Sequence, residues 1–244
     1  MKKDERNDIS VKILISGALK GLGACLCKKF LNEGHEVYAG VFSTVNLMEL
    51  ETVSDHPNLT IVPLDVSRKE SIQEARRIID GHTKHLDVII NVAGVLLNRD
   101  SYITSDTYED INLTFQVNTI GPIYLNNHFF DLLQKSDQAT LINISSEILS
   151  IDGVGAKFGT YAMSKTAIAQ YGFVLKATCV ENNLPIRVFS IHPGRMKTEM
   201  GAENGEIDAH ISAEGIYKIA VGQVLKENKE IYVNYKGEAM LSSI

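Results

Sequence analysis

Cysteine is scarce in this sequence, and the positions of the few cysteines argue against a disulfide-stabilised fold. Only three of the 244 residues are cysteines, namely Cys25, Cys27 and Cys179. An odd count without paired spacing predicts no disulfide framework. Cys25 and Cys27 are also too close together to form the CxxC pair of a redox protein. We therefore expect three buried thiols, as in a protein kept in a reducing compartment.

Excess positive charge and long apolar runs are also lacking. Lys and Arg total 24 against 30 Asp and Glu, a formal net charge of -6. Nucleic acid is not expected as a partner, because binding it requires a cationic face. No stretch reaches the roughly 18 uninterrupted apolar residues that a membrane span needs. Residues 1–10 are polar, without the apolar region of a signal peptide. We expect a cytoplasmic protein with no membrane partner and no metal site.

Short apolar, β-branched runs alternate with segments of helical apolar spacing along the chain. The runs that predict strands are residues 11–16, 36–42, 59–64, 86–92, 139–144, 186–191 and 230–233. The segments that predict helices are 21–33, a helix beginning at Ser67, 105–120, 122–134, 160–181 and 213–226. Ser67, with Glu70 three residues later, fits a capping box. Pro122 suits the first turn of a helix.

This alternation predicts an α/β fold. The expected architecture is one Rossmann-type domain over residues 11–244, in which a doubly wound parallel sheet lies between two layers of helices. A flexible tail, residues 1–10, is expected to precede it. In such sheets ligands bind beyond the carboxyl ends of the strands. The informative residues should therefore come directly after predicted strands.

A glycine-rich loop follows the first predicted strand, with the sequence Ser16-Gly17-Ala18-Leu19-Lys20-Gly21-Leu22-Gly23. Its glycines allow a sharp turn and a close approach to a pyrophosphate, and the helix that follows offers N–H groups to the phosphates. A purely structural turn is the alternative interpretation. The position of the loop after the first strand favours a dinucleotide site.

Two further positions bear on which dinucleotide binds. Lys20, inside the loop, is placed to pair with the 2′-phosphate of NADP, unless it is an ordinary solvated lysine. The second predicted strand ends in Gly40-Val-Phe-Ser43, without an acid that would hydrogen-bond the ribose diol of NAD. We therefore expect NADP(H) to be favoured over NAD(H). Asp65 either accepts from the adenine amino group or is an acid at the start of a helix.

A tyrosine and a lysine four residues apart open the long helix at 160–181. This spacing places Tyr161 and Lys165 on one helix face. The ammonium and the helix dipole both favour phenolate, so the pKa of Tyr161 is expected to fall from its reference value of about 10 toward working pH. Tyr161 would then serve as a general acid or base. Ser145 and Ser146, after the fifth strand, are candidates to hydrogen-bond a substrate oxygen or to cap a turn.

These motifs, in this order, resemble those of the short-chain dehydrogenase/reductase family over nearly the whole chain. The glycine loop resembles the TGxxxGxG motif of that family, with Ser16 in place of threonine. Asn91-Val-Ala-Gly94 resembles its NNAG motif, which lies beside the adenine ribose. Pro193-Gly-Arg-Met-Lys-Thr198 resembles its PGxxxT segment, in which the backbone and Thr198 would hold the nicotinamide carboxamide.

The resemblance implies an NAD(P)(H)-dependent oxidoreductase that transfers a hydride between nicotinamide and a carbonyl or alcohol carbon. The implied catalytic tetrad is Asn118, Ser146, Tyr161 and Lys165, with Lys165 on the nicotinamide ribose and Asn118 supporting a water-mediated proton relay. The expected coenzyme contacts are Gly17, Lys20, Gly21, Leu22, Gly23, Ser43, Asp65, Val66, Asn91, Ala93, Gly94, Tyr161, Lys165, Pro193, Gly194, Met196 and Thr198. A homodimer or homotetramer is the expected assembly.

Three departures from the family pattern stand out. Phe42 occupies a position where NADP-dependent relatives often have arginine. The loop 147–160 is longer than in many members, and segment 199–212 is short and polar, which predicts an open substrate site. The chain is similar to the small carbonyl-reductase-like group that includes Sniffer and C-factor proteins.

Two alternatives to the reductase remain open from the sequence. One is a catalytically silent NADP(H)-binding sensor on the same fold, which would need no paired Tyr161 and Lys165. The other is an epimerase or dehydratase, which would normally need a sugar-nucleotide domain that this length does not provide.

Overall fold

The strands form one parallel sheet. The computed structural model describes residues 10–45, 47–148, 157–201, 205–227 and 229–240. The strands are β1 (Lys12–Ser16), β2 (Glu36–Val41), β3 (Leu59–Pro63), β4 (Val88–Asn91), β5 (Thr140–Ile144), β6 (Arg187–His192) and β7 (Tyr232–Asn234). Their order is β3-β2-β1-β4-β5-β6-β7, all parallel. The order reverses between β1 and β4, which is the predicted doubly wound arrangement.

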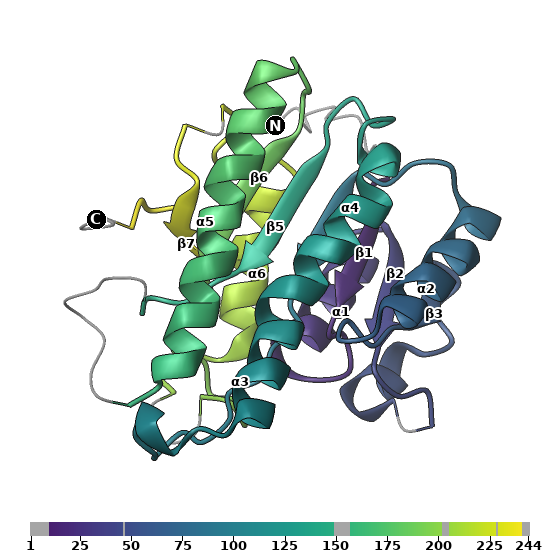
Figure 1. The fold of residues 1–244 in the computed structure, drawn as a ribbon. Helices are drawn as coiled ribbons and strands as arrows, with labels where there is room; N and C mark the ends of the chain where they lie inside the picture. Colours follow the sequence, from purple (N-terminus) through teal and green to yellow (C-terminus); the bar gives the residue numbers. More distant parts are fainter. Residues whose placement is uncertain (1–9, 46, 149–156, 202–204, 228, 241–244) are drawn as a thin grey trace.

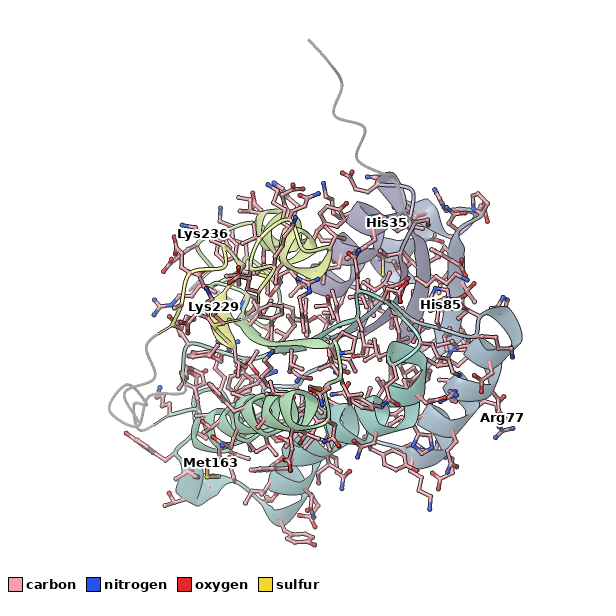
Figure 2. The ribbon with its side chains drawn as sticks, turned by 90° about the horizontal axis from the view of Figure 1, so that it is seen from above. His35, Arg77, His85, Met163, Lys229 and Lys236 are labelled. Carbon is pink, nitrogen blue, oxygen red and sulfur yellow. The ribbon has the colours of Figure 1, made fainter. Side chains whose placement is uncertain are left out.

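Helices cover both faces of the sheet, so the molecule has three layers (Figure 1). One layer holds α1 (Gly21–Asn32) and α6 (Ala209–Ala220), and the other holds α2 (Lys69–His82), α4 (Gly121–Leu133) and α5 (Gly159–Glu181). Figure 2 separates the layers, with α1 and α6 on the side of His35 and α5 on the side of Met163. The predicted three-layer α/β fold is confirmed.

The core lies on both faces of the sheet because side chains alternate along each strand. In β1, Ile13 and Ile15 pack toward α1 and α6, whereas Leu14 packs toward α2 and α4. In β4, Ile90 packs toward α1 and α6, and Ile89 packs toward α2 and α4. Strands that are apolar on both faces belong in a central parallel sheet.

The start of α2 differs from the prediction. No capping box forms at Ser67, and α2 begins at Lys69 without a side-chain cap. Both the backbone N–H and the hydroxyl of Ser67 donate to Asp65 Oδ1, at 2.9 and 2.6 Å. This local turn consumes the hydroxyl that the capping box needs. A capping box forms instead between Thr107 and Asp110, at the start of α3 (Tyr108–Phe115).

The two helices predicted on either side of residue 121 are joined. α3 (Tyr108–Phe115) continues through a π turn, η3 (Gln116–Ile120), directly into α4. The Gly121 N–H donates to the Gln116 carbonyl oxygen, five residues back. Pro122 has no N–H, so the wider turn falls where the regular helix ladder would lack a donor. The expected break between the two helices is therefore wrong.

The last helix begins and ends earlier than predicted. α6 runs from Ala209 to Ala220, not to residue 226. Gly222 adopts a φ of +72°, and its N–H donates to the Ile219 carbonyl oxygen at 3.1 Å. A glycine in this left-handed conformation is a common helix terminator.

The expected flexible tail falls almost wholly outside the described residues. Of positions 1–10, only Ser10 is described, and its hydroxyl donates to the Gly34 carbonyl oxygen at 3.1 Å. Much of the long loop 147–160 also lies outside, because residues 149–156 are not described.

Candidate active site

The sheet register brings the predicted site loops to one edge. Ser16 at the end of β1 lies beside Asn91 at the end of β4, and Asn91 lies beside Asn143 in β5. Asn143 in turn pairs with Ser190 in β6. The loops that follow these strands therefore share the carboxyl edge of the sheet, on the side of α3 in Figure 1.

The glycine loop is held against the loop after β4. The Ser16 hydroxyl accepts from the backbone N–H groups of Val92 and Ala93, at 3.2 and 3.4 Å. Gly17 has a φ of +69°, and a Cβ there would lie 2.6 Å from the Ala93 nitrogen. Only glycine fits this approach without displacing the neighbouring backbone. Ser16 thus joins the end of β1 to the loop after β4.

The N-terminus of α1 already holds a carboxylate. Lys20 is the N-cap but provides no side-chain cap. Instead, the Gly21 N–H donates to Glu49 Oε2 at 3.1 Å, and the Glu49 N–H donates to the Leu19 carbonyl oxygen at 3.2 Å. Sequence reasoning missed Glu49, because it looked for an acid only at the end of the second strand. Lys20 itself forms an ion pair with Glu199, which lowers the pKa of that carboxyl.

The loops after β2 and β3 contain the other coenzyme positions expected near the adenine. Ser43 is partly exposed, and its hydroxyl accepts from the Val45 N–H at 3.4 Å. Asp65 is engaged with Ser67, which matches the alternative interpretation of Asp65 as an acid before a helix. Val66 is buried, with its carbonyl oxygen packed against Gly121.

Asn91 directs its side chain into a buried cluster of amides. Its Nδ2 donates to Asn126 Oδ1 at 2.8 Å and to Asn143 Oδ1 at 2.9 Å. All three side chains are almost fully buried. The Asn91 side chain therefore connects β4 to β5 and α4. A coenzyme would be left to contact the backbone of Asn91.

The reactive end of the site consists of Ser146, Tyr161 and Lys165. The Ser146 hydroxyl lies close enough to the Tyr161 phenol to lower the pKa of that phenol. Lys165 Nζ lies 5.8 Å from the centroid of the Tyr161 ring and donates to the Ile144 carbonyl oxygen at 2.8 Å. Ser145 turns away, and its hydroxyl donates weakly to the Lys165 carbonyl oxygen at 3.4 Å. Of the two candidate serines, Ser146 is therefore the one that faces the phenol.

The pKa of Tyr161 moves in the direction opposite to the one expected. Burial raises the pKa of Tyr161 to about 12, while the Ser146 hydroxyl and the charge of Arg99 lower it. Burial also lowers the pKa of Lys165 to about 8. The prediction of a phenol made acidic by Lys165 is thus wrong for the protein without coenzyme, because desolvation penalises both charged forms.

Asn118 lies in the π turn and fixes the loop after β4. Its Oδ1 accepts from the Val95 N–H at 2.8 Å, and its Nδ2 donates to the Val95 carbonyl oxygen at 2.9 Å and to the Ser164 hydroxyl at 3.0 Å. A Cβ on Gly94 would lie 3.3 Å from Asn118 Oδ1 and 3.5 Å from Lys165 Nζ. Asn118 and Lys165 therefore converge on Gly94, although no hydrogen bond between them is present.

The segment from Pro193 to Thr198 is paired with the chain that follows it. Pro193 is buried, and Gly194 has a φ of +82°. Met196 forms a bridge with Ile207, so part of the short segment 199–212 folds back along this stretch. The Thr198 hydroxyl accepts from the Gly201 N–H at 3.2 Å. The methyl of Thr198 faces Gly21 across the site, 3.4 Å from where a Cβ would lie.

The residues present fit a dinucleotide. The loop after β1 approaches the loop after β4 too closely for side chains, and the α1 N-terminus binds an anionic oxygen from Glu49 in the way it would bind a phosphate. Lys20, Gly21 and Leu22 would hold the phosphates. Thr198 and Lys165 would lie near the nicotinamide and its ribose.

The described residues contain neither a membrane-spanning helix nor a cluster of metal ligands. No described helix has the length and apolar character needed to cross a membrane. No group of three or more described His, Cys, Asp or Glu side chains is arranged to hold a metal ion.

Comparison with known proteins agrees with the motifs. The family model for short chain dehydrogenases matches residues 11–208. An uncharacterized oxidoreductase of Schizosaccharomyces pombe is 32% identical over 194 residues, covering 78% of this chain and 75% of that protein. The NADP-dependent 3-hydroxy acid dehydrogenase YdfG of Escherichia coli is 26% identical over 183 residues, covering 75% of this chain and 71% of that protein.

Solved structures show the same relationship. The carbonyl reductase Sniffer of D. melanogaster superposes with a TM-score of 0.86 at 28% identity, covering 95% of this chain and 99% of that one. An NADPH-bound carbonyl reductase from chicken fatty liver superposes with a TM-score of 0.84 at 27% identity, covering 95% and 98%. The chain therefore belongs to the short-chain dehydrogenase family of oxidoreductases and is similar to its carbonyl-reductase-like members.

Proposed function

We propose that this protein is an NADP(H)-dependent oxidoreductase that interconverts a carbonyl compound and the corresponding alcohol. The observation that carries the proposal is the grouping of Lys165 and Ser146 around the Tyr161 phenol: Lys165 Nζ lies 5.8 Å from the centroid of that ring, and the Ser146 hydroxyl is close enough to lower the pKa of the phenol. Two hydroxyls and a cation at the carboxyl edge of the sheet form a site that binds a carbonyl oxygen and delivers a proton to it.

The roles follow from the positions of the side chains. The hydroxyls of Ser146 and Tyr161 hydrogen-bond the substrate oxygen, and Tyr161 gives its proton to that oxygen as the carbonyl carbon is reduced. The bound nicotinamide supplies the hydride. Lys165 holds positive charge near the phenol and stabilises the phenolate that remains. Asn118 fixes the loop after β4 through Val95, so that Lys165 and Gly94 keep their places.

The proposed preference for NADP(H) rests on several observations. Lys20 lies in the glycine loop, and residues 40–43 contain no acid. The chicken reductase is described as NADPH-bound, and YdfG as NADP-dependent. Glu49 acts in the other direction, because it places a carboxylate at the α1 N-terminus.

The proposed setting is a cytoplasmic homodimer or homotetramer. One exposed strip of α5 carries Met163 and Val174, which are 45% and 56% exposed and lie about three helical turns apart. Apolar side chains on an outward helix face are suited to contact between subunits. Figure 2 shows Met163 on the outer side of this layer.

The substitution Tyr161→Phe tests the proposal against the sensor alternative. It removes the proton donor and keeps the ring, so we expect turnover of ketones, aldehydes and quinones with NADPH to fall by about 100-fold or more. NADPH binding, measured by fluorescence titration, should stay close to wild type. Normal turnover in this variant would overturn the mechanism. Binding of NADPH without turnover of any carbonyl by the wild type would favour the sensor.

A further inference from the structure

Cationic side chains stand on several loops around the reactive end, and most of them already hold a carboxylate. The ion pairs are Lys20–Glu199, Lys157–Asp100, Arg195–Glu147 and Lys197–Asp208. Arg99 differs from them. Among the residues that the structure describes, no Asp or Glu forms an ion pair with its guanidinium.

Arg99 joins the N-cap of α5 to the segment after Thr198. Its guanidinium carbon lies 5.9 Å from the centroid of the Phe158 ring, at the N-cap of α5. Its Nη2 donates to the Met200 carbonyl oxygen, in the segment after Thr198. The charge of Arg99 also acts on the Tyr161 phenol, where it lowers the pKa against the effect of burial. These contacts place the guanidinium between Phe158, three residues before Tyr161, and Met200, two residues after Thr198.

The loop that carries Arg99 is held by a network of side chains. Asn98 has a φ of +50°, and its Nδ2 donates to Asp106 Oδ1 at 3.1 Å and to Asp110 Oδ2 at 2.9 Å. The Thr160 hydroxyl donates to the other oxygen of Asp106. This network ties the backbone next to Arg99 to the first turn of the helix that carries Tyr161.

A guanidinium placed in this way is suited to a carboxylate. It has five N–H donors in a planar fork that matches two carboxylate oxygens. One donor is bonded to a backbone carbonyl, and the aromatic ring of Phe158 lies against the guanidinium. A carbonyl held by Ser146 and Tyr161 would have Arg99 on the side of Met200.

We infer that Arg99 binds a carboxylate of the substrate, and that the carbonyl compounds reduced here are short oxo acids that leave as hydroxy acids. The inference rests on the proposed function and adds a substrate class to it. The carboxylate keeps its charge throughout. Only the carbonyl changes, taking a hydride on carbon from NADPH and a proton on oxygen from Tyr161.

The test compares an acid with its neutral ester. Reduction of acetoacetate and of methyl acetoacetate is followed by NADPH oxidation for wild type, Arg99→Gln and Arg99→Lys. We expect Arg99→Gln to lower kcat/KM for the acid by about 10- to 100-fold while the ester changes little, because a charged hydrogen bond is lost only with the acid. Arg99→Lys should keep part of the preference. Lys157→Gln removes a cation that is already paired and should leave the ratio of acid to ester unchanged.

A binding measurement separates this inference from the proposed function. Butanoate has a carboxylate but no carbonyl, and its binding to wild type and Arg99→Gln is measured by calorimetry in the presence of NADP. Butanoate binding that depends on Arg99, without turnover of any ketone, aldehyde or quinone of the panel, would support the carboxylate site at Arg99 and contradict the proposed function. Equal turnover of acid and ester by the wild type would overturn the inference alone. Parallel loss of both substrates, or a weaker affinity for NADPH, in Arg99→Gln would also overturn it.

Discussion

The reactive end and the glycine-loop end of the site differ in the partners that their polar groups contact. At the reactive end, the functional groups lie beside one another or bond to nearby backbone: Ser146 and Lys165 lie beside Tyr161, and Lys165 donates to the Ile144 carbonyl oxygen. At the end formed by the glycine loop, carboxylates from other segments engage the groups that phosphates would use. Glu49 accepts from the Gly21 N–H, and Glu199 pairs with Lys20.

This difference predicts different consequences for substitutions at the two ends. The reactive end is arranged before any ligand arrives, so its residues should affect turnover strongly and coenzyme affinity weakly. The glycine-loop end must exchange internal carboxylates for phosphate oxygens when a dinucleotide binds. Its residues should therefore alter affinity by modest factors that depend on salt, because these pairs are exposed.

The largest effect expected in this comparison comes from the two adjacent serines. Ser146→Ala removes a hydroxyl that faces the phenol, and we expect kcat to fall by about 100- to 1,000-fold, as for the loss of one donor to a developing oxyanion. Ser145→Ala removes a hydroxyl that points to the Lys165 backbone, and it should stay near wild type. Steady-state reduction with NADPH measures both. The reverse order would assign the role to Ser145, and equal losses would mean that neither hydroxyl acts alone.

Much of the fold and of the reactive end could be predicted from sequence. The strand runs are local and strongly apolar, and the motifs after them share one edge because parallel strands all end there. The features that were missed depend on contacts distant in sequence. Glu49 meets Gly21 only through the packing of the 3-10 helix Met48–Val53, and the sign of the Tyr161 pKa shift depends on a burial that no motif spacing reveals.

Burying the Lys165 ammonium at the reactive end should lower the unfolding free energy of the protein. The folded chain has a Lys165 pKa near 8, against 10.5 ordinarily. The unfolded chain therefore binds more protons between these two pH values, and the unfolding free energy of the wild type rises with pH across that window. Lys165→Met removes a buried charge, although it leaves the Ile144 carbonyl oxygen without this donor. We expect a gain of about 1–3 kcal/mol at pH 7, with loss of turnover.

Urea denaturation of wild type and Lys165→Met at pH 7 and at pH 10 measures the difference in unfolding free energy. The advantage of Lys165→Met should shrink at pH 10, because the wild type has by then recovered part of the penalty. Lys69→Met, at the exposed start of α2, is the matched control. It should leave the unfolding free energy nearly unchanged at both pH 7 and pH 10. A gain that is the same at both pH values would argue against a pKa shift at Lys165 as its source.

The smallest effect is expected at the glycine-loop end. It tests whether an internal carboxylate there competes with a coenzyme phosphate. Glu49→Gln keeps a hydrogen-bond acceptor for the Gly21 N–H but removes the charge that competes with a phosphate. We expect the affinity for NADPH to rise by about two- to fivefold at low salt, and the gain to fade as salt is added. Titrations of NADPH and NADH against wild type, Glu49→Gln and Glu51→Gln measure this, since Glu51 lies on the same short helix without contact to Gly21. A similar gain in NADPH affinity for Glu51→Gln would show that the change in net charge alone causes the effect. Tighter NADH than NADPH binding by the wild type would overturn the proposed preference for NADP(H).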